Sequence, residues 1–329
     1  MKNKIILVIG MHRSGTSIIT KSLECLNVPI GSNFIETIRD VNLHGFFEDK
    51  DFNDFNKKLL TYNKQSWYQT SKKRIENLKF SKKLIKEAEE LIHKKIKNNI
   101  LALKDPACTL LIRFWVTVFE NCGIDFHIIY CLRNPSSISK SLEKRDHFDI
   151  DFSLLLTNFY HSNFLDILET KEINFTVIEY ESFLNNPKYF LKKLSDNLNL
   201  TFNNKKFNVL KKAFINKNLN HHISDKKFDS KPLNNLSIEI FNIIKNLCNN
   251  KKTGLKELKP RIDLMNNIFD YFLESSTTFI NEKNIQHFQF QGIVANKNDE
   301  FNSMEKQFQG IVANKNDEFN SMEKQFQGI

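Results

Sequence analysis

Residues 5–17 read IILVIGMHRSGTS, and this stretch decides the fold. The apolar, β-branched run from Ile5 to Ile9 is typical of a buried strand in a parallel sheet, because such strands are covered on both faces. Gly10 ends the run, and the residues from Thr16 to Leu26 are predicted to form a helix. A loop that joins a strand directly to a helix N-terminus points several backbone N–H groups at one spot. The stretch therefore predicts a phosphate-binding loop at residues 10–15.

This loop lacks one feature of nucleotide triphosphatases. In those enzymes a lysine precedes the Ser or Thr of the pattern G-x-x-x-x-G-K-[ST] and reaches the β- and γ-phosphates. Thr16 stands at the position of that lysine, and no apolar strand ends in an Asp suited to hold magnesium. We therefore predict a phosphate site without kinase or ATPase chemistry, with Arg13 supplying positive charge. An ordinary glycine turn is the alternative interpretation.

Strands and helices alternate along the next 180 residues, as far as about residue 200. Short apolar runs predict three more strands, at 100–103, 126–132 and 175–178. Helices are expected over most of 50–98 and at 110–120, 136–144, 152–168 and 187–198. Such alternation is typical of an α/β fold with a central parallel sheet and helices on both faces. Residues 203–259 are rich in Asn and Lys and give no clear pattern.

The composition suits a cytoplasmic protein with an anionic ligand. The 329 residues, 40% of them hydrophobic, suffice for one large α/β domain or two small ones. The net charge of +10 favours an anionic ligand or, equally, a lysine-rich solvated surface. The five cysteines form no C-x-x-C pair and are predicted to be reduced thiols. No apolar run reaches membrane-spanning length, and the first one lacks a cleavage site, so we expect no membrane span.

The C-terminal stretch is an internal repeat. Residues 290–307 read FQGIVANKNDEFNSMEKQ, residues 308–325 repeat them without change, and a third copy starts at 326. Eighteen residues are five helical turns, so the apolar residues of each copy fall on one stripe. We divide the chain into a catalytic domain at 1–285 and helical tandem repeats at 286–329. The repeats form a homo-oligomeric coil in one interpretation and are a duplication without a role in the other.

A second anion site is predicted at the end of the third strand. Arg133 follows this strand, and the carboxyl ends of strands are where ligands of open α/β sheets bind. Ser141 and Arg145 lie four residues apart on the following helix and share one face. The three side chains can converge on one phosphate group, with forked donors from the arginines and a hydroxyl from the serine. A surface cluster of arginine and glutamate is the alternative.

The two elements together resemble the PAPS-dependent sulfotransferases, in the branch with an Arg-Ser-Gly-Thr loop. This branch includes tyrosylprotein sulfotransferases and many bacterial carbohydrate sulfotransferases, and its second element has the same Arg, Ser and Arg spacing. Lys104-Asp105-Pro106 and the segments 42–49 and 177–187 are similar to further parts of the family. The resemblance covers about residues 4–200. Many cytosolic members carry a catalytic lysine in the first loop, where this chain has Arg13.

The resemblance implies a P-loop-type three-layer sandwich that uses PAPS as sulfuryl donor and needs no metal. The first loop is then expected to hold the 5′-phosphosulfate through Arg13, Ser14, Gly15, Thr16 and Ser17. The second element is expected to hold the 3′-phosphate through Arg133, Ser141 and Arg145. The expected acceptor is a hydroxyl group of a carbohydrate in a surface polysaccharide or a glycolipid. No nucleic acid is expected as a partner.

Catalysis needs a cation for the leaving oxygen and a base for the acceptor hydroxyl. Lys104 is the candidate cation, with a structural salt bridge to Asp105 as the alternative. Glu48 is the first candidate base, and Glu36, His44 and Asp105 are the others. His12 either orients the loop or reacts. Two other functions stay open at this point: a P-loop kinase or NTPase, and a non-catalytic nucleotide-binding protein that oligomerises through its repeats.

Overall fold

The computed structural model describes residues 3–35, 45–70, 72–97, 99–214 and 232–247, together with nine residues between 259 and 273. Its centre is a parallel sheet with the strand order β2-β1-β3-β4. The strands are β1 (Lys4–Gly10), β2 (Ile100–Lys104), β3 (Asp125–Leu132) and β4 (Phe175–Glu179). Each predicted strand is confirmed to within one residue at either end. The candidate base residues Glu36 and His44, Cys248 and the repeats at 286–329 lie outside the described residues.

Helices connect the strands. They are α1 (Thr16–Ser22), η1 (Leu23–Leu26), α2 (Lys50–Tyr62), α3 (Lys72–Glu76), α4 (Lys82–Lys95), η2 (Pro106–Thr109), α5 (Ile112–Asn121), α6 (Pro135–Asp146), α7 (Ile150–Thr170), α8 (Tyr180–Asn185), α9 (Pro187–Leu198), α10 (Asn204–Ala213) and α11 (Pro232–Leu247). The predicted helix at 16–26 is divided, because its last four residues form a 3-10 turn that ends at the left-handed Asn27 (φ 58°). The helices α10 and α11 occupy the stretch that gave no clear pattern.

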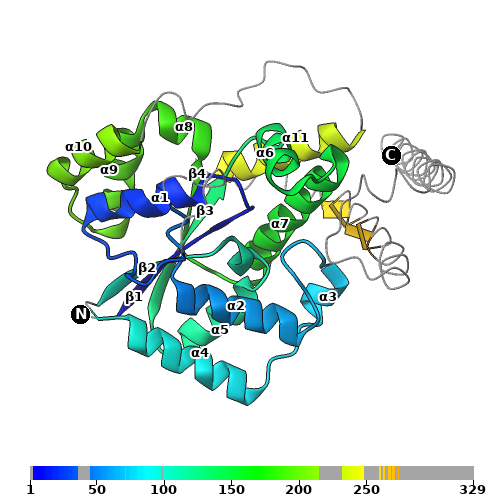
Figure 1. The fold of residues 1–329 in the computed structure, drawn as a ribbon, viewed down its shortest axis with the longest axis horizontal. Helices are drawn as coiled ribbons and strands as arrows, with labels where there is room; N and C mark the ends of the chain where they lie inside the picture. The colour runs from blue at the N-terminus through cyan, green and yellow to red at the C-terminus, as the bar shows by residue number, and fades with distance from the viewer. Residues whose placement is uncertain are drawn as a thin grey trace, which may run out of the picture.

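Alternate residues of each strand enter two separate apolar cores, as expected for a sheet that is buried on both faces. Ile5, Leu7 and Ile9 of β1 pack on one side with α2, α4, α5, α6, α7 and α11. Ile6 and Val8 pack on the other side with α1, η1, α9 and α10. In Figure 1, α1, α9 and α10 lie together at the left of the view, whereas α2, α4 and α5 lie along its lower part. The three-layer α/β sandwich is therefore confirmed.

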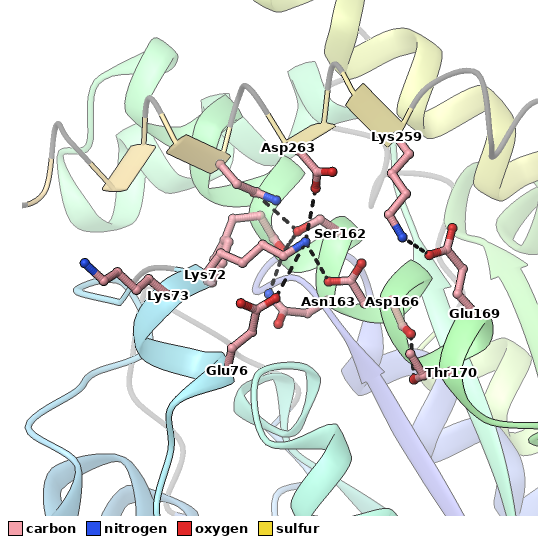
Figure 2. A network of polar contacts seen from close by, with 12 residues as sticks. Lys72, Lys73, Glu76, Ser162, Asn163, Asp166, Glu169, Thr170, Lys259 and Asp263 are labelled. Carbon is pink, nitrogen blue, oxygen red and sulfur yellow. Dashed lines mark hydrogen bonds and ion pairs between the residues drawn. The ribbon is translucent and has the colours of Figure 1, made fainter.

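The described residues between 259 and 273 contact α3 and α7 through a polar network centred on Lys72 (Figure 2). The Nζ atom of Lys72 lies 3.0 Å from Asp166 Oδ2 of α7 and 3.3 Å from Asp263 Oδ1. Burial lowers the pKa of Lys72, but the two carboxylates outweigh this effect and raise it above its ordinary value. Phe269 is fully buried in the larger core. The described residues in this stretch thus pack on the same domain as α3 and α7.

Candidate functional site

The carboxyl ends of all four strands meet at one edge of the sheet because the strands are parallel. Gly10 at the end of β1 is in register with Cys131 of β3, and Leu132 of β3 is in register with Glu179 of β4. On the other side of β1, Val8 is in register with Lys104, the last residue of β2. The predicted phosphate-binding loop therefore lies between two neighbouring strand ends, where open α/β sheets bind ligands.

The loop between β1 and α1 has a left-handed backbone at two positions. Arg13 has a φ of 69° and Gly15 a φ of 86°. An added Cβ at Gly15 would lie 2.1 Å from Cδ2 of Tyr180, so this position accepts only glycine. The base of the loop is held by Thr109, whose hydroxyl accepts from Gly10 N at 3.0 Å and donates to Gly10 O at 3.2 Å. The loop conformation is thus fixed by the protein itself.

Arg13 connects the loop to the second predicted element. Its Nε atom donates to the hydroxyl of Ser141 on α6 at 2.7 Å. Its carbonyl oxygen accepts a hydrogen bond from Nη1 of Arg133 at 2.7 Å. The structure therefore brings Arg13 together with Arg133 and Ser141, which lie 120 and 128 residues from it in the sequence.

Two residues of α8 support Arg133. Its guanidinium carbon lies 4.6 Å from the ring centroid of Tyr180, within the range of a cation–π interaction. Its Nε atom lies 3.6 Å from a carboxylate oxygen of Glu181. Arg133 is 8% exposed, so the glutamate and the aromatic ring stabilise a largely buried charge. Sequence reasoning did not assign either residue to the site, although the segment 177–187 had been noted.

Arg145 is the third arginine near the loop. Its Nε atom pairs with Asp146 at 2.7 Å, and its guanidinium lies 5.4 Å from the ring of Trp67. The same indole packs on the imidazole of His12, with ring centroids 4.2 Å apart. Trp67 precedes α3 and carried no signal of a site in the sequence, because a lone aromatic residue is more often part of a core.

The cations of the site repel one another. Burial, then Arg145 and Arg133, lower the pKa of Arg13 from 12.5 to about 10. Burial, then Arg145, Lys104 and Arg13, lower the pKa of His12 well below its ordinary value. His12 is therefore neutral near pH 7. An anion bound here would relieve the repulsion among the arginines.

Two buried polar atoms of the loop have no hydrogen-bond partner within the part of the chain that the structure describes. They are the hydroxyl oxygen of Ser14 and Nε2 of His12. Buried polar groups are nearly always paired in folded proteins, so unpaired atoms in a phosphate-binding loop are consistent with contacts made to a ligand. Thr16 is buried at the start of α1, and Ser17 donates to the carbonyl of Phe46 at 3.1 Å.

Lys104 and Glu48 form an ion pair beside the loop. Nζ of Lys104 lies 2.5 Å from Oε1 of Glu48, 3.1 Å from the carbonyl of Phe46 and 3.4 Å from the Ser17 hydroxyl. Lys104 is thus paired with Glu48, not with Asp105 as the structural alternative had it. Lys104 is 3% exposed and Glu48 is 9% exposed; the two are in contact with each other, and Lys104 also contacts Ser17.

The ten predicted site residues all belong to described parts of the chain. The described residues contain no group of three or more His, Cys, Asp and Glu side chains placed to hold a metal ion. Nor does any described helix have the length and apolar character needed to cross a bilayer.

No protein-family model matches the chain, and no curated protein matches it in sequence. Among solved structures, it is similar to the sulfotransferase domain of the Synechococcus olefin synthase, with 14% identity and a TM-score of 0.47 over 74% of this chain and 95% of that one. The sulfotransferase STF1 of Mycobacterium tuberculosis has 9% identity and a TM-score of 0.39, over 73% and 77% of the two chains. The sulfotransferase domain of the curacin biosynthetic pathway has 17% identity and a TM-score of 0.37, over 62% of this chain and 76% of that one.

Proposed function

We propose that this protein is a sulfotransferase that moves a sulfuryl group from PAPS to a hydroxyl acceptor. The observation that carries the proposal is the gathering of four cationic side chains around a preformed phosphate-binding loop. These side chains are Arg13, Lys104, Arg133 and Arg145. A nucleotide with phosphate groups at two positions of its ribose suits two adjacent cationic elements better than a nucleotide with a single phosphate chain.

The residues present fit the donor. The loop Arg13–Ser17 offers backbone N–H groups, the start of α1 and the unpaired hydroxyl of Ser14 to the 5′-phosphosulfate. Arg133, Ser141 and Arg145 offer two guanidinium groups and a hydroxyl to the 3′-phosphate. The lysine that an ATPase needs at position 16 is a threonine here, which favours the bisphosphate nucleotide over ATP.

PAPS supplies an activated sulfuryl group, which leaves when the bond between sulfur and the bridging oxygen breaks. In this proposal Arg13 and Lys104 stabilise the negative charge that grows on the bridging oxygen. Glu48 accepts the proton of the acceptor hydroxyl while the acceptor oxygen bonds to sulfur. The products are the sulfate ester, PAP and a protonated Glu48, which returns its proton to solvent.

We also propose that the acceptor is a carbohydrate hydroxyl of a surface polysaccharide or glycolipid, from the resemblance to bacterial carbohydrate sulfotransferases. Residues 1–285 would be the catalytic domain of a cytoplasmic enzyme, and the repeats at 286–329 would join copies of the chain.

Calorimetric titration with PAP and, separately, with ATP tests the donor site. We expect tight binding of PAP, little binding of ATP, and PAP binding weaker by about 10- to 100-fold in Arg133→Ala, because charge-assisted hydrogen bonds are each worth about 1.5–3 kcal/mol. Arg113→Ala is the matched control, since Arg113 is an exposed arginine of α5 that bonds to Thr170. Equal binding of ATP and PAP, or no effect of Arg133→Ala, would overturn the proposal. Transfer of labelled sulfate to a panel of glycans then identifies the acceptor.

A further inference from the structure

A second carboxylate lies next to the Lys104–Glu48 pair, and the mechanism above does not use it. Asp105 is 1% exposed and follows Lys104 at the end of β2. Its Oδ1 atom accepts from Ala107 N at 2.9 Å and begins η2. Its Oδ2 atom accepts from Nδ2 of two asparagines of α2, Asn53 at 3.0 Å and Asn56 at 2.9 Å. A buried carboxylate with three donors is a built element of the site.

Asn53 connects this carboxylate to the candidate base. Its Nδ2 group donates to Oε2 of Glu48 at 3.0 Å and to Oδ2 of Asp105 at 3.0 Å. The amide thus uses both of its hydrogens on carboxylates. The other oxygen of Glu48, Oε1, faces Lys104. Hydrogen bonds thus join Asp105, Asn53, Glu48 and Lys104 in a row, with acceptors and donors in turn. Both carboxylate oxygens of Glu48 have a defined partner.

Several contacts hold the helix that carries the two asparagines. Nε1 of Trp115 donates to Oδ1 of Asn56 at 2.8 Å, which fixes the direction of its amide group. The ring of Phe52, the neighbour of Asn53 on α2, packs 4.6 Å from that of Trp115. The helix itself begins at Asp49, whose side chain accepts from Phe52 N at 3.1 Å. Because the helix is held in this way, Asn53 can determine where the carboxylate of Glu48 lies.

The charges around Asp105 come from every element that packs on it. Lys104 of β2 and Glu48 are the charged neighbours, and the neutral Cys108 of η2 and Tyr160 of α7 are the other titratable ones. Burial, and then the charge of Glu48, raise the pKa of Asp105 from 3.8 to about 7. Asp105 therefore exchanges between its ionised and neutral forms near pH 7, and it is mostly neutral below this pH.

We propose that Asn53 and Asp105 are positioning residues for the base: Asp105 fixes the amide of Asn53, and Asn53 holds the carboxylate of Glu48 in place. This inference rests on the proposed function. It assigns a role in sulfuryl transfer to a pair that touches neither donor nor acceptor. Removal of Asp105 takes away one acceptor of the Asn53 amide, and removal of the Asn53 amide leaves Oε2 of Glu48 without this donor.

The test is a pH titration of the Glu48 side chain by NMR, with carboxyl-labelled glutamate and with Glu48→Gln for assignment. Asn53→Ala should move the titration midpoint of Glu48 to higher pH, by about one unit, a tenfold change in proton affinity, because Oε2 of Glu48 loses a hydrogen bond that favours its ionised form. Asp105→Ala should move it in the same direction and by less, because the amide of Asn53 loses its second partner. Asn63→Ala, which removes an asparagine at the C-terminal end of the same helix, should not move it. A purely structural role would change stability without these shifts.

Kinetics and ligand binding complete the test. With an acceptor that the enzyme sulfates, the acid limb of the plot of kcat against pH should shift in the same direction. The KM for the acceptor should change less than kcat. PAP affinity should stay within threefold of wild type in both variants, which also shows that they fold. Unchanged midpoints in variants that bind PAP would overturn the inference. Failure of the wild type to bind PAP would instead overturn the proposed function.

Discussion

Replacement of Gly15 by alanine should destabilise the protein and weaken its phosphate site together. Gly15 has a φ of 86°, and an alanine in the left-handed region costs about 1–2 kcal/mol. The added Cβ would also lie 2.1 Å from Cδ2, 2.7 Å from Cε2 and 3.0 Å from Cγ of Tyr180. The whole ring must move, and such overpacking costs about 1–3 kcal/mol. We therefore expect a loss of about 2–5 kcal/mol in the free energy of unfolding.

Gly123→Ala is the matched control for this substitution. Gly123 lies between α5 and β3, has a φ of 63°, and its added Cβ would meet nothing within 4 Å. The control therefore carries the backbone strain without the overpacking. Urea unfolding of both variants should give a difference of about 1–3 kcal/mol, the steric contribution alone.

The ring of Tyr180 also supports Arg133, so its displacement should lower PAP affinity in Gly15→Ala and not in Gly123→Ala. In a Tyr180→Ala background, Gly15→Ala should cost only the backbone strain, because the clashing ring is gone. The reasoning is refuted if Gly15→Ala is no more destabilising than Gly123→Ala, or if loss of the ring brings no relief.

Three further predictions concern charge. Arg13→Gln should weaken PAP binding at least tenfold, yet leave the ligand-free protein as stable in urea as the wild type or more so, because its two neighbouring arginines repel Arg13. The pKa of Asp105 is raised from 3.8 to about 7, so its contribution to stability should be lost as pH rises from about 4 to about 7. The difference in unfolding free energy between pH 5 and pH 8 should therefore be smaller in Asp105→Asn than in the wild type. Lys72→Met should lower the melting temperature and speed proteolysis near residue 259, because Asp166 loses its partner; the same cleavage rate in variant and wild type would contradict this.

The strands and the loop could be predicted because local patterns determine them. A β-branched run that ends in glycine can hardly be anything but a buried strand, and each predicted strand proved correct. Parallel strands share one carboxyl edge, so Arg13, Lys104 and Arg133 were bound to lie near each other once the sheet was predicted. Ser141 followed from the helical spacing after Arg133. The alternation of elements thus carried most of the candidate site.

The supporting residues could not be predicted, because their contacts join distant parts of the chain. Asn53 reaches Asp105 over 52 positions, and nothing in its own segment names that partner. The one available signal was two buried asparagines, Asn53 and Asn56, on the apolar face of α2. Polar residues on such a face must find buried partners. Tyr180 and Trp67 had no comparable signal, since aromatic residues fill cores in most proteins.

The helices α10 and α11 escaped prediction because of composition. Their asparagines disfavour a helix, and their lysines do not distinguish a helix from a solvated loop. The apolar spacing was nevertheless present, as in Ile240, Ile244 and Leu247 of α11, which all enter the core. In this part of the chain, packing on the sheet decides the structure more than local propensity does.

The position of β1 inside the sheet has a consequence for exchange with solvent. β1 has hydrogen-bonded neighbours on both sides, and Thr109 fixes its last residue. Amide hydrogens at the base of the loop can therefore exchange with deuterium only when the centre of the sheet opens, and this opening is close to global unfolding. We expect them to be among the slowest to exchange even without nucleotide. Because the loop is already ordered, little of the binding free energy is needed to order it. Nucleotide should therefore associate without a slow conformational phase.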